Sequence, residues 1–267
     1  MNPRRDEPAP LALLARRLRD ARRVVAITGA GVSAESGLRT FRGATVADLP
    51  ADMQALWKEF DPASLATPEA FDANPAMVTK WYDWRRLGCL AAEPNPGHAA
   101  LAELEHQLHA RGGTLTLLTQ NVDRLHQRAG STNVVELHGS IIDWRCTRTG
   151  RRVTPDAAPM PAFPPPSPFD PAGLLRPDVV WFGEALPEDA LTRAGEAAVE
   201  CDVFLSLGTS AVVYPAAAFS RLASSHGAFT GEINLEATPI SNSVDVSIRA
   251  RTGDALPRVV ELAFGEG

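Results

Sequence analysis

Short apolar runs alternate with longer segments of mixed polarity along most of the chain, and this alternation indicates the fold. Apolar residues recur at helical spacing in the longer segments, which predicts helices at 10–22, 97–111, 188–199 and 215–226. Apolar strands that alternate with helices favour a parallel, doubly wound α/β sheet, a Rossmann-like arrangement. The runs of strand length are RVVAIT at 23–28, TLTLLT at 114–119, NVVELHG at 133–139, DVFLSLGTS at 202–210 and GEINLEATP at 231–239.

Two regions interrupt this alternation. Residues 44–95 contain helical pieces but no strand that fits the sheet, and residues 145–177 include TPDAAPMPAFPPPSPFDPAG. Proline removes a backbone donor and fixes φ, so we expect no helix or sheet to run through the second region. The two regions are predicted to form a smaller lobe, whereas residues 1–43, 96–144 and 178–267 form the Rossmann-like domain.

Composition narrows the class of protein. The chain has 267 residues, 45% of them hydrophobic, which is ample for a core. Its net charge of −6 argues against nucleic-acid binding, and it has no apolar run of membrane-spanning length. The three cysteines are widely spaced, which suits a reducing cytoplasm. Of the possible oligomeric states, we favour a monomer.

The arginine-rich start of the chain has two interpretations. A mitochondrial presequence is one, but Asp6, Glu7 and Asp20 are unusual in such a segment. Leu11, Leu14 and Leu18 recur at helical spacing, so we favour an amphipathic helix packed on the domain.

Polar motifs follow the predicted strands at the points where they end. Glycine lets a ligand approach the backbone, and N–H groups between a strand and a helix form a phosphate cradle. The carboxyl ends of parallel strands meet at one edge of the sheet, where ligands bind. The motifs therefore predict one extended nucleotide site; they are Gly29 with Gly31, Gln120 to Asp123, His138 with Gly139, Gly208 to Ser210, and Asn234 to Glu236.

An ordinary dehydrogenase fingerprint fits poorly. Gly29, Gly31 and Ala34 satisfy G-x-G-x-x-A, but the motif also needs an acid about 20 residues on, at the end of a strand. Asp48 and Asp52 lie at that distance within ATVADLPADMQ, which is no strand. The dehydrogenase interpretation is weakened accordingly.

Ordered motifs instead resemble those of the sirtuins, most closely the bacterial class III branch. The motifs are GAGVSAESGLRTFRG, TQNVDRLHQRAG, VVELHGS, LRPDVVWFGE, LGTSAVVYPAA and INLEATP, and the resemblance runs from about residue 10 to 262. It implies NAD-dependent removal of acetyl, succinyl or malonyl groups from protein lysines. The products would be nicotinamide, O-acyl-ADP-ribose and free lysine.

The resemblance also implies roles for individual residues. His138 would draw a proton from the ribose hydroxyls, and Asn121 would assist it. A free histidine titrates near pH ~6.5, which suits a base at neutral pH. Asp123 would bind the nicotinamide amide, Gln120 and Asn121 the ribose hydroxyls, and Phe41 would shield the ribose from water. The residues implied for the cofactor are Gly29, Ala30, Gly31, Glu35, Thr40, Phe41, Arg42, Gln120, Asn121, Asp123, Gly208, Thr209, Ser210, Asn234, Glu236 and Thr252.

The other histidines have structural interpretations. For an isolated histidine we would favour a strand-end cap, but the ELHG context favours the catalytic role for His138. His98 and His126 are expected to be structural. The remaining three, His106, His109 and His226, are expected on helix surfaces.

An acyl-lysine site is predicted between the lobes. The stretch from Val179 to Glu184 is expected to be extended and to pair with a substrate strand. Trp181 and Phe182 would flank the lysine stem, and the alternative is a buried aromatic edge. The implied substrate residues of this stretch are Val180, Trp181, Phe182 and Gly183.

Tyr82 and Arg85 are three residues apart, so on a helix they share a face. This Y-x-x-R resembles the class III pattern that binds the distal carboxylate of succinyl- or malonyl-lysine. The alternative is that Arg85 is a solvated arginine like Arg86, with Tyr82 in the core. In that case the enzyme would be a general deacetylase.

The chain departs from the family at a zinc site. Most sirtuins carry two cysteine pairs in the small lobe, but residues 145–177 contain only Cys146, with Thr149 where a partner would fall. A structural zinc site needs four N or S ligands, so we predict that zinc is absent. Proline rigidity and contacts from Met160, Phe163 and Phe169 are then expected to hold the lobe.

Two other functions remain open. A sirtuin-like ADP-ribosyltransferase would use a nucleophile other than acyl-lysine. A non-catalytic NAD or ADP-ribose sensor would lack the base, but His138 and Asn121 are present.

Overall fold

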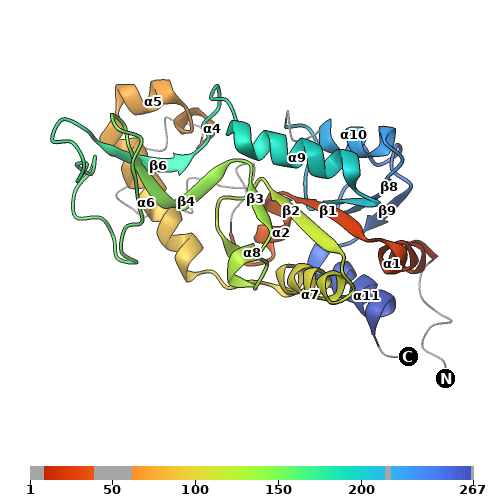
Figure 1. Cartoon of the computed structure of the whole chain (residues 1–267). Helices are drawn as coiled ribbons and strands as arrows, with labels where there is room; N and C mark the ends of the chain where they lie inside the picture. Colours follow the sequence, from red (N-terminus) through yellow and green to blue (C-terminus); the bar gives the residue numbers. More distant parts are fainter. Residues whose placement is uncertain (1–8, 39–61, 214–217, 266–267) are drawn as a thin grey trace.

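The computed structural model describes residues 9–38, 62–213 and 218–265, which form a large and a small lobe (Figure 1). The large lobe contains a six-stranded sheet in the order β3-β2-β1-β7-β8-β9, and all neighbouring pairs are parallel. This confirms the predicted doubly wound sheet. Its strands are β1 (Arg23–Thr28), β2 (Thr114–Thr119), β3 (Val134–Glu136), β7 (Val203–Leu207), β8 (Phe229–Asn234) and β9 (Val246–Arg249).

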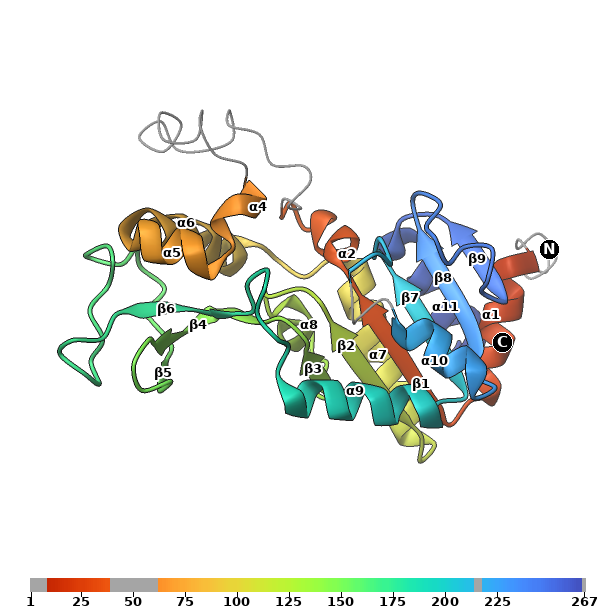
Figure 2. The same ribbon diagram turned by 90° about the horizontal axis from the view of Figure 1, so that it is seen from above.

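Helices cover both faces of this sheet (Figure 2). On one face, α1 (Ala9–Asp20), α7 (Pro96–Ala110) and α11 (Thr252–Phe264) pack against residues such as Val24 and Ala26. On the other face, α9 (Glu188–Glu200) and α10 (Phe219–Ser225) pack against Val25 and Ile27. Successive side chains of a strand point to opposite faces, so a strand covered on both sides is apolar throughout.

Helix α1 confirms the amphipathic interpretation of the N-terminal region, because Leu14 and Leu18 are buried in the core and Leu11 packs against it. Strand β9 and helix α11 were not predicted. The strand is only VSIR, and the helix contains Gly253 and Pro257, which weaken a helical signal. Nowhere in the described ranges is a helix long and apolar enough to cross a membrane.

The small lobe combines helices with a three-stranded antiparallel sheet in the order β5-β4-β6. Its helices are α4 (Pro62–Leu65), α5 (Pro68–Ala73) and α6 (Pro75–Ala91), and its strands are β4 (Gly139–Cys146), β5 (Arg152–Val153) and β6 (Leu175–Val179).

The prediction was that no helix or sheet runs through residues 145–177, and strands do extend into this region at both of its ends. Strand pairing reaches Cys146 from one side and starts at Leu175 on the other. Between these strands, β5 lies just before the proline-rich stretch, which itself contains the isolated bridge Pro166–Leu174. Strands β4 and β6 also cross the proposed domain boundaries at 144/145 and 177/178, and the division into domains stays a prediction.

A second apolar core joins helix α6 to the small sheet. Trp81 and Tyr82 of α6 belong to the same buried cluster as Trp144 of β4. Met160 and Phe169 pack against this cluster, as expected from the sequence. Phe163 is not among the cluster's residues.

A buried ion pair ties α6 to the proline-rich segment. Arg86 has 0% exposure, so its interpretation as a solvated arginine was wrong. Its Nε and Nη2 atoms donate to Oδ1 of Asp83 at 2.9 and 2.7 Å. The same guanidinium donates to the carbonyls of Asp156 and Ala158, both at 2.7 Å. Oδ2 of Asp83 accepts the Met160 N–H at 3.0 Å, so one pair fixes the backbone of this segment at three points.

Candidate active site

The turns after β1 and β7 are in direct contact. The Gly31 N–H donates to the Gly208 carbonyl at 2.8 Å, and the Gly29 N–H donates to the Leu207 carbonyl at 3.1 Å. A Cβ at Gly29 would lie 2.8 Å from Cα of Thr209, and one at Gly31 would lie 2.7 Å from the Gly208 oxygen. The glycines are therefore needed for packing within the chain, in addition to any ligand contact.

Amide side chains from the end of β2 link these turns. Nδ2 of Asn121 donates to the Gly29 carbonyl at 3.0 Å and to Oγ of Ser33 at 2.8 Å. Nε2 of Gln120 donates to Oγ1 of Thr209 at 2.9 Å. The structure thus brings three of the predicted motifs together at one edge of the sheet.

Asp123 lies buried beneath this edge. Its Oδ2 accepts the Ser33 hydroxyl at 2.6 Å, and its Oδ1 accepts the Leu125 N–H at 2.9 Å. Each carboxylate oxygen keeps a further lone pair. Sequence reasoning did not single out Ser33, although it lies in the glycine motif on α2 (Ala30–Ala34), between Asn121 and Asp123.

His138 follows β3 and is oriented by the backbone around it. Its Nδ1 lies 3.0 Å from the Gln120 carbonyl oxygen. A carbonyl only accepts, so Nδ1 carries the proton and Nε2 keeps a lone pair. Burial lowers the pKa of His138, which leaves the ring neutral and able to accept a proton at pH 7.

The glycine after this histidine has a steric reason. Gly139 has φ of 72°, and a Cβ there would lie 2.1 Å from the carbonyl oxygen of Asp178. The Val180 N–H donates to the His138 carbonyl at 3.0 Å. The His-Gly pair therefore marks the point where the chain passes from the large sheet into the small one.

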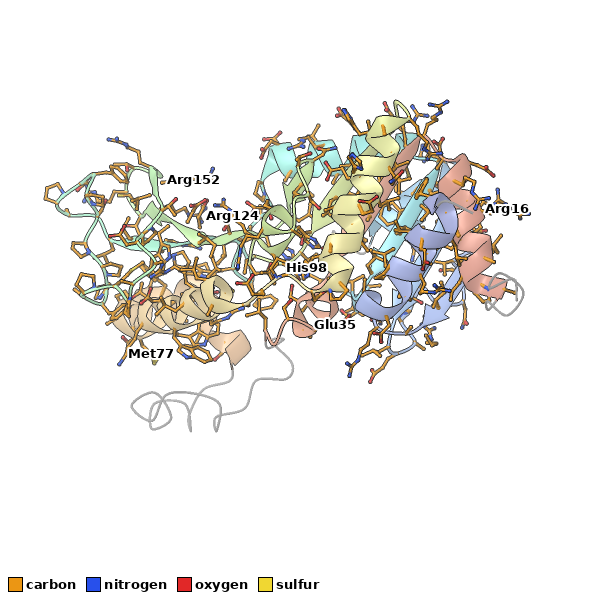
Figure 3. All side chains as sticks on the ribbon, turned by 90° about the horizontal axis from the view of Figure 1, so that it is seen from below. Arg16, Glu35, Met77, His98, Arg124 and Arg152 are labelled. Carbon is orange, nitrogen blue, oxygen red and sulfur yellow. The ribbon has the colours of Figure 1, made fainter. Side chains whose placement is uncertain are left out.

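Arg124, which sequence reasoning missed, is labelled in Figure 3 and binds acidic side chains on both sides of His138 in the sequence. It binds Glu136 of β3 at 3.1 Å and Asp143 of β4 at 2.5 Å. It lies at the N-terminus of α8 (Leu125–Arg128) with φ of 61°. A positive φ is unusual for an arginine, but it is a property of the structure. The sequence alone carries no local signal for the role of Arg124.

A buried hydrogen-bonded chain runs behind the site. Nε2 of His126 lies 2.9 Å from Oγ1 of Thr28, which donates to Oγ1 of Thr119 at 2.9 Å. The same Thr119 oxygen accepts the Asn121 N–H at 3.1 Å. The His98 ring lies 4.7 Å from that of His126. Burial lowers the pKa of His98 to about 4 and that of His126 to about 3, so both rings are neutral.

Two predicted cofactor residues meet at the start of α11. The Glu35 carboxylate accepts the Gly253 N–H at 3.0 and 3.3 Å, and Thr252 is buried beside it as the first residue of α11. Burial raises the pKa of Glu35. These contacts are internal, and the cofactor roles of both residues stay predictions.

At the end of β8, Nδ2 of Asn234 donates to the Glu236 carbonyl at 3.1 Å. The predicted cofactor residues Thr40, Phe41 and Arg42 lie outside the described residues.

The stretch from Val179 to Glu184 was predicted to be extended, and this prediction is wrong for the residues after Val180. Residues 181–184 form a turn in which the Glu184 N–H donates to the Trp181 carbonyl at 3.0 Å. Gly183 has φ of 87°, and the Glu184 carboxylate binds Arg176 at 2.6 and 2.9 Å, which folds the chain back. Trp181 is buried, and the Arg176 guanidinium lies over its ring, 3.2 Å from the ring centroid. Phe182 is 53% exposed.

Tyr82 and Arg85 lie on α6, as predicted. Tyr82 is buried, with its ring 6.2 Å from that of Trp181, and burial raises its pKa to about 12. The Arg85 guanidinium lies 4.9 Å from the Trp81 ring and 5.6 Å from the Tyr82 ring.

Among the described residues, Cys146 lacks the further ligands that a zinc site needs. Hydrogen bonds from the Ser167 and Thr149 side chains lower the pKa of this thiol to about 7. Within the part of the chain that the structure covers, no group of three or more His, Cys, Asp or Glu side chains could hold a metal ion. A tetrahedral structural zinc needs four such ligands, so these residues do not fit the zinc that the resemblance implies.

A cavity of about 710 Å³ lies in the small lobe, between α5 and the charged face of the small sheet. Its lining includes Arg145, Arg176 and Asp178, and Trp181 is the predicted site residue that it shares. The cavity is therefore separate from the edge of the large sheet.

Amide, carboxylate and imidazole groups gather at the carboxyl edge of a doubly wound sheet, which is where α/β proteins of this class bind nucleotides. The sequence model of the Sir2 family matches residues 29–215. A Pyrobaculum aerophilum protein named NAD-dependent protein deacylase 2 is 50% identical over 244 residues, which cover 91% of this chain and 92% of the relative. An NAD-dependent protein deacylase of Thermus thermophilus is 48% identical over 237 residues, 88% of this chain and 87% of that protein.

Solved structures agree with these relatives. A crystal structure of a Sir2 homologue–NAD complex matches with a TM-score of 0.85 at 41% identity, covering 94% of this chain and 93% of that chain. The chain belongs to the Sir2 family.

Proposed function

We propose that this chain is an NAD-dependent protein lysine deacylase, which moves the acyl group of a modified lysine to ADP-ribose. The observation that carries the proposal is the orientation of His138. Its Nδ1 is held by the Gln120 carbonyl at 3.0 Å, so Nε2 is available at the edge where the predicted NAD residues meet. The family membership and the names of the relatives support the same activity.

The residues present fit NAD. The contacting turns at Gly29–Gly31 and Gly208–Ser210 would hold the two phosphates, and Asn234 with Glu236 would hold the adenine ribose. Asp123, whose carboxylate is oriented by Ser33 and Leu125, would accept the nicotinamide amide. When bound, NAD supplies a ribose carbon from which nicotinamide can leave.

The chain's own groups then bind, orient and move a proton. Gln120 and Asn121 are held by Thr209, Gly29 and Ser33, so their remaining polar atoms are fixed for the ribose hydroxyls. Nε2 of His138 would accept a proton from one of these hydroxyls, and the bound NAD would then supply that oxygen as a nucleophile toward the acyl group. A neutral ring is needed for this step, and the lowered pKa of His138 provides it.

The test is an analysis of products by mass spectrometry. Incubation with NAD and an acetyl- or succinyl-lysine peptide should release nicotinamide, O-acyl-ADP-ribose and unmodified peptide. A peptide that gains ADP-ribose would instead identify an ADP-ribosyltransferase. Absence of any turnover with bound ADP-ribose would identify a sensor. Either result overturns the proposal.

We also propose a preference for succinyl- and malonyl-lysine. Tyr82 is a neutral phenol at neutral pH, and burial raises its pKa further, to about 12, so its hydroxyl can donate to a carboxylate. The Arg85 guanidinium lies 5.6 Å from its ring and can add a charged donor. The Tyr82 ring lies 6.2 Å from that of Trp181, which the resemblance places beside the lysine stem.

The small lobe is proposed to work without zinc. The Asp83–Arg86 pair and the apolar cluster around Trp144 support this, because they fix the proline-rich segment through the chain's own groups. A cytoplasmic location is proposed as well. Cys89, Cys146 and Cys201 are all free thiols, as a reducing compartment would keep them.

A further inference from the structure

Strand β8 carries a buried carboxylate that the proposed reaction does not use. Glu232 is 1% exposed and lies in the middle of the strand. Thr230, Glu232 and Asn234 share one face because side chains alternate along a strand. Isolated carboxylates are expensive to bury, so this one must be compensated by donors.

Donors from two separate parts of the chain surround Glu232. Ser247 and Arg249 of β9 donate to Oε2 at 2.7 and 3.1 Å. In the connection between β8 and β9, Ser241 donates to Oε2 at 2.7 Å, and Thr238 donates to Oε1. Burial alone would raise the pKa of Glu232, but these hydrogen bonds outweigh it and hold the pKa below its ordinary value.

A second contact fastens the same connection. Oδ2 of Asp245 accepts both the N–H and the hydroxyl of Thr230, at 2.7 and 2.9 Å. Residues 235–245 are therefore folded back over the polar face of β8 and attached to it at Thr230 and at Glu232.

Arg249 connects Glu232 to the exposed turn at residues 234–236. Its Nη1 lies 3.1 Å from Glu232 Oε2 and also 3.1 Å from the Glu236 carbonyl oxygen. That carbonyl is the one that accepts from Nδ2 of Asn234. Leu235 between them is 63% exposed, so the turn has little apolar packing to hold it.

We propose that Glu232 is a positioning residue for the adenosine end of NAD, acting through Arg249, Thr238 and Ser241 on the turn at Asn234–Glu236. The proposal rests on the proposed function, which assigns this turn to the adenine ribose. Glu232 is 1% exposed, so it would act through these neighbours and not by contacting the ligand. Without the Glu232 carboxylate, Arg249 loses one of its two contacts and the turn at residues 234–236 is less ordered. Binding of the ligand must then also provide the free energy of ordering this turn.

The experiment measures binding and turnover separately. ADP-ribose affinity is measured by calorimetry for the wild type and Glu232→Gln, together with KM for NAD, kcat and inhibition by nicotinamide. The Kd for ADP-ribose should rise about tenfold, equivalent to about 1.4 kcal/mol, and KM for NAD should rise with it. The kcat and the inhibition by nicotinamide should stay at wild-type values, because the proposed function assigns the nicotinamide end to Asp123 and not to this turn.

A second variant covers the case in which Glu232→Gln does not fold. Thr238→Val with Ser241→Ala removes donors from the connection while the strand residue stays, and should raise the same Kd. Glu261→Gln is the matched control, since this exposed glutamate pairs with Arg258 on α11.

Folded variants with an unchanged Kd for ADP-ribose, or with kcat and nicotinamide inhibition lost to the same extent, overturn the inference. The calorimetry needs no acyl substrate. A wild type that binds ADP-ribose but leaves acyl-lysine intact therefore contradicts the proposed function alone.

Discussion

Replacing Arg86 by leucine should strongly destabilise the small lobe. The guanidinium is completely buried and pairs with Asp83, which is 2% exposed. It also supplies the donors for two carbonyls of the proline-rich segment, at Asp156 and Ala158. The substitution removes all of these contacts and leaves a buried carboxylate without a counter-charge.

The magnitude follows from the buried charge. Removing one partner of a buried ion pair costs about 3–5 kcal/mol, against a total stability of about 5–15 kcal/mol for a typical protein. At about 2–4 °C per kcal/mol for a protein of this size, the thermal midpoint should fall by roughly 6–20 °C. The lost carbonyl partners add to this cost.

Thermal unfolding followed by circular dichroism, with limited proteolysis to locate the opening, measures the effect. New cleavage sites are expected within residues 154–174. Arg85→Leu is the matched control on the same helix, and should shift the midpoint far less because Arg85 is only half-buried.

The double variant Asp83→Leu with Arg86→Leu separates charge from shape. It has no unpaired charge, so it should recover much of the stability that Arg86→Leu loses. If the single variant unfolds at the wild-type midpoint, or if the double variant is less stable than the single one, the pair is not what holds this segment.

Four further predictions concern chemistry and pH. His138→Ala should bind ADP-ribose normally but lose turnover by about 10²–10⁴-fold, the usual contribution of a general base; near-normal turnover would contradict that role. Arg85→Met should lower desuccinylation about ten- to a hundredfold (about 1.5–3 kcal/mol) and deacetylation much less, measured on one peptide in both acylated forms; equal losses would make Arg85 structural. Elemental analysis should find no stoichiometric zinc and chelators should not inhibit, whereas about one zinc per chain would require ligands not identified above. The pKa values of about 4 and about 3 for His98 and His126 lie below the unfolded value of ~6.5. The unfolded chain therefore binds more protons, and stability should fall as pH drops below ~6.5, by up to about 1.4 kcal/mol per unit for each histidine. Equal unfolding midpoints at pH 7 and pH 5 would show that these rings are not buried neutral.

The sequence by itself determined the central strands of the large lobe and predicted the edge of the sheet at which the polar motifs gather. The predicted strands at 23–28 and 114–119 match β1 and β2 at both bounds. They could be found because helices cover both faces of the sheet, so most residues of these strands are buried and apolar on both faces. The clustering of the polar motifs could be predicted as well. Residues that follow parallel strands lie at the same edge of the sheet.

Only the tertiary structure decided how the parts hold one another. Arg85 and Arg86 are neighbours of the same residue type, yet Arg86 is fully buried because its partners at Asp156 and Ala158 come from about 70 residues away. Glycine at position 139 is required by the approach of the Asp178 carbonyl on a different strand. The turn at 181–184, which the sequence suggested as extended, is closed by Glu184 binding back to Arg176. Local sequence patterns indicate which face of a helix or strand is apolar. The charged groups and backbone atoms that pair with a buried polar side chain come from distant parts of the sequence, so local patterns do not predict them.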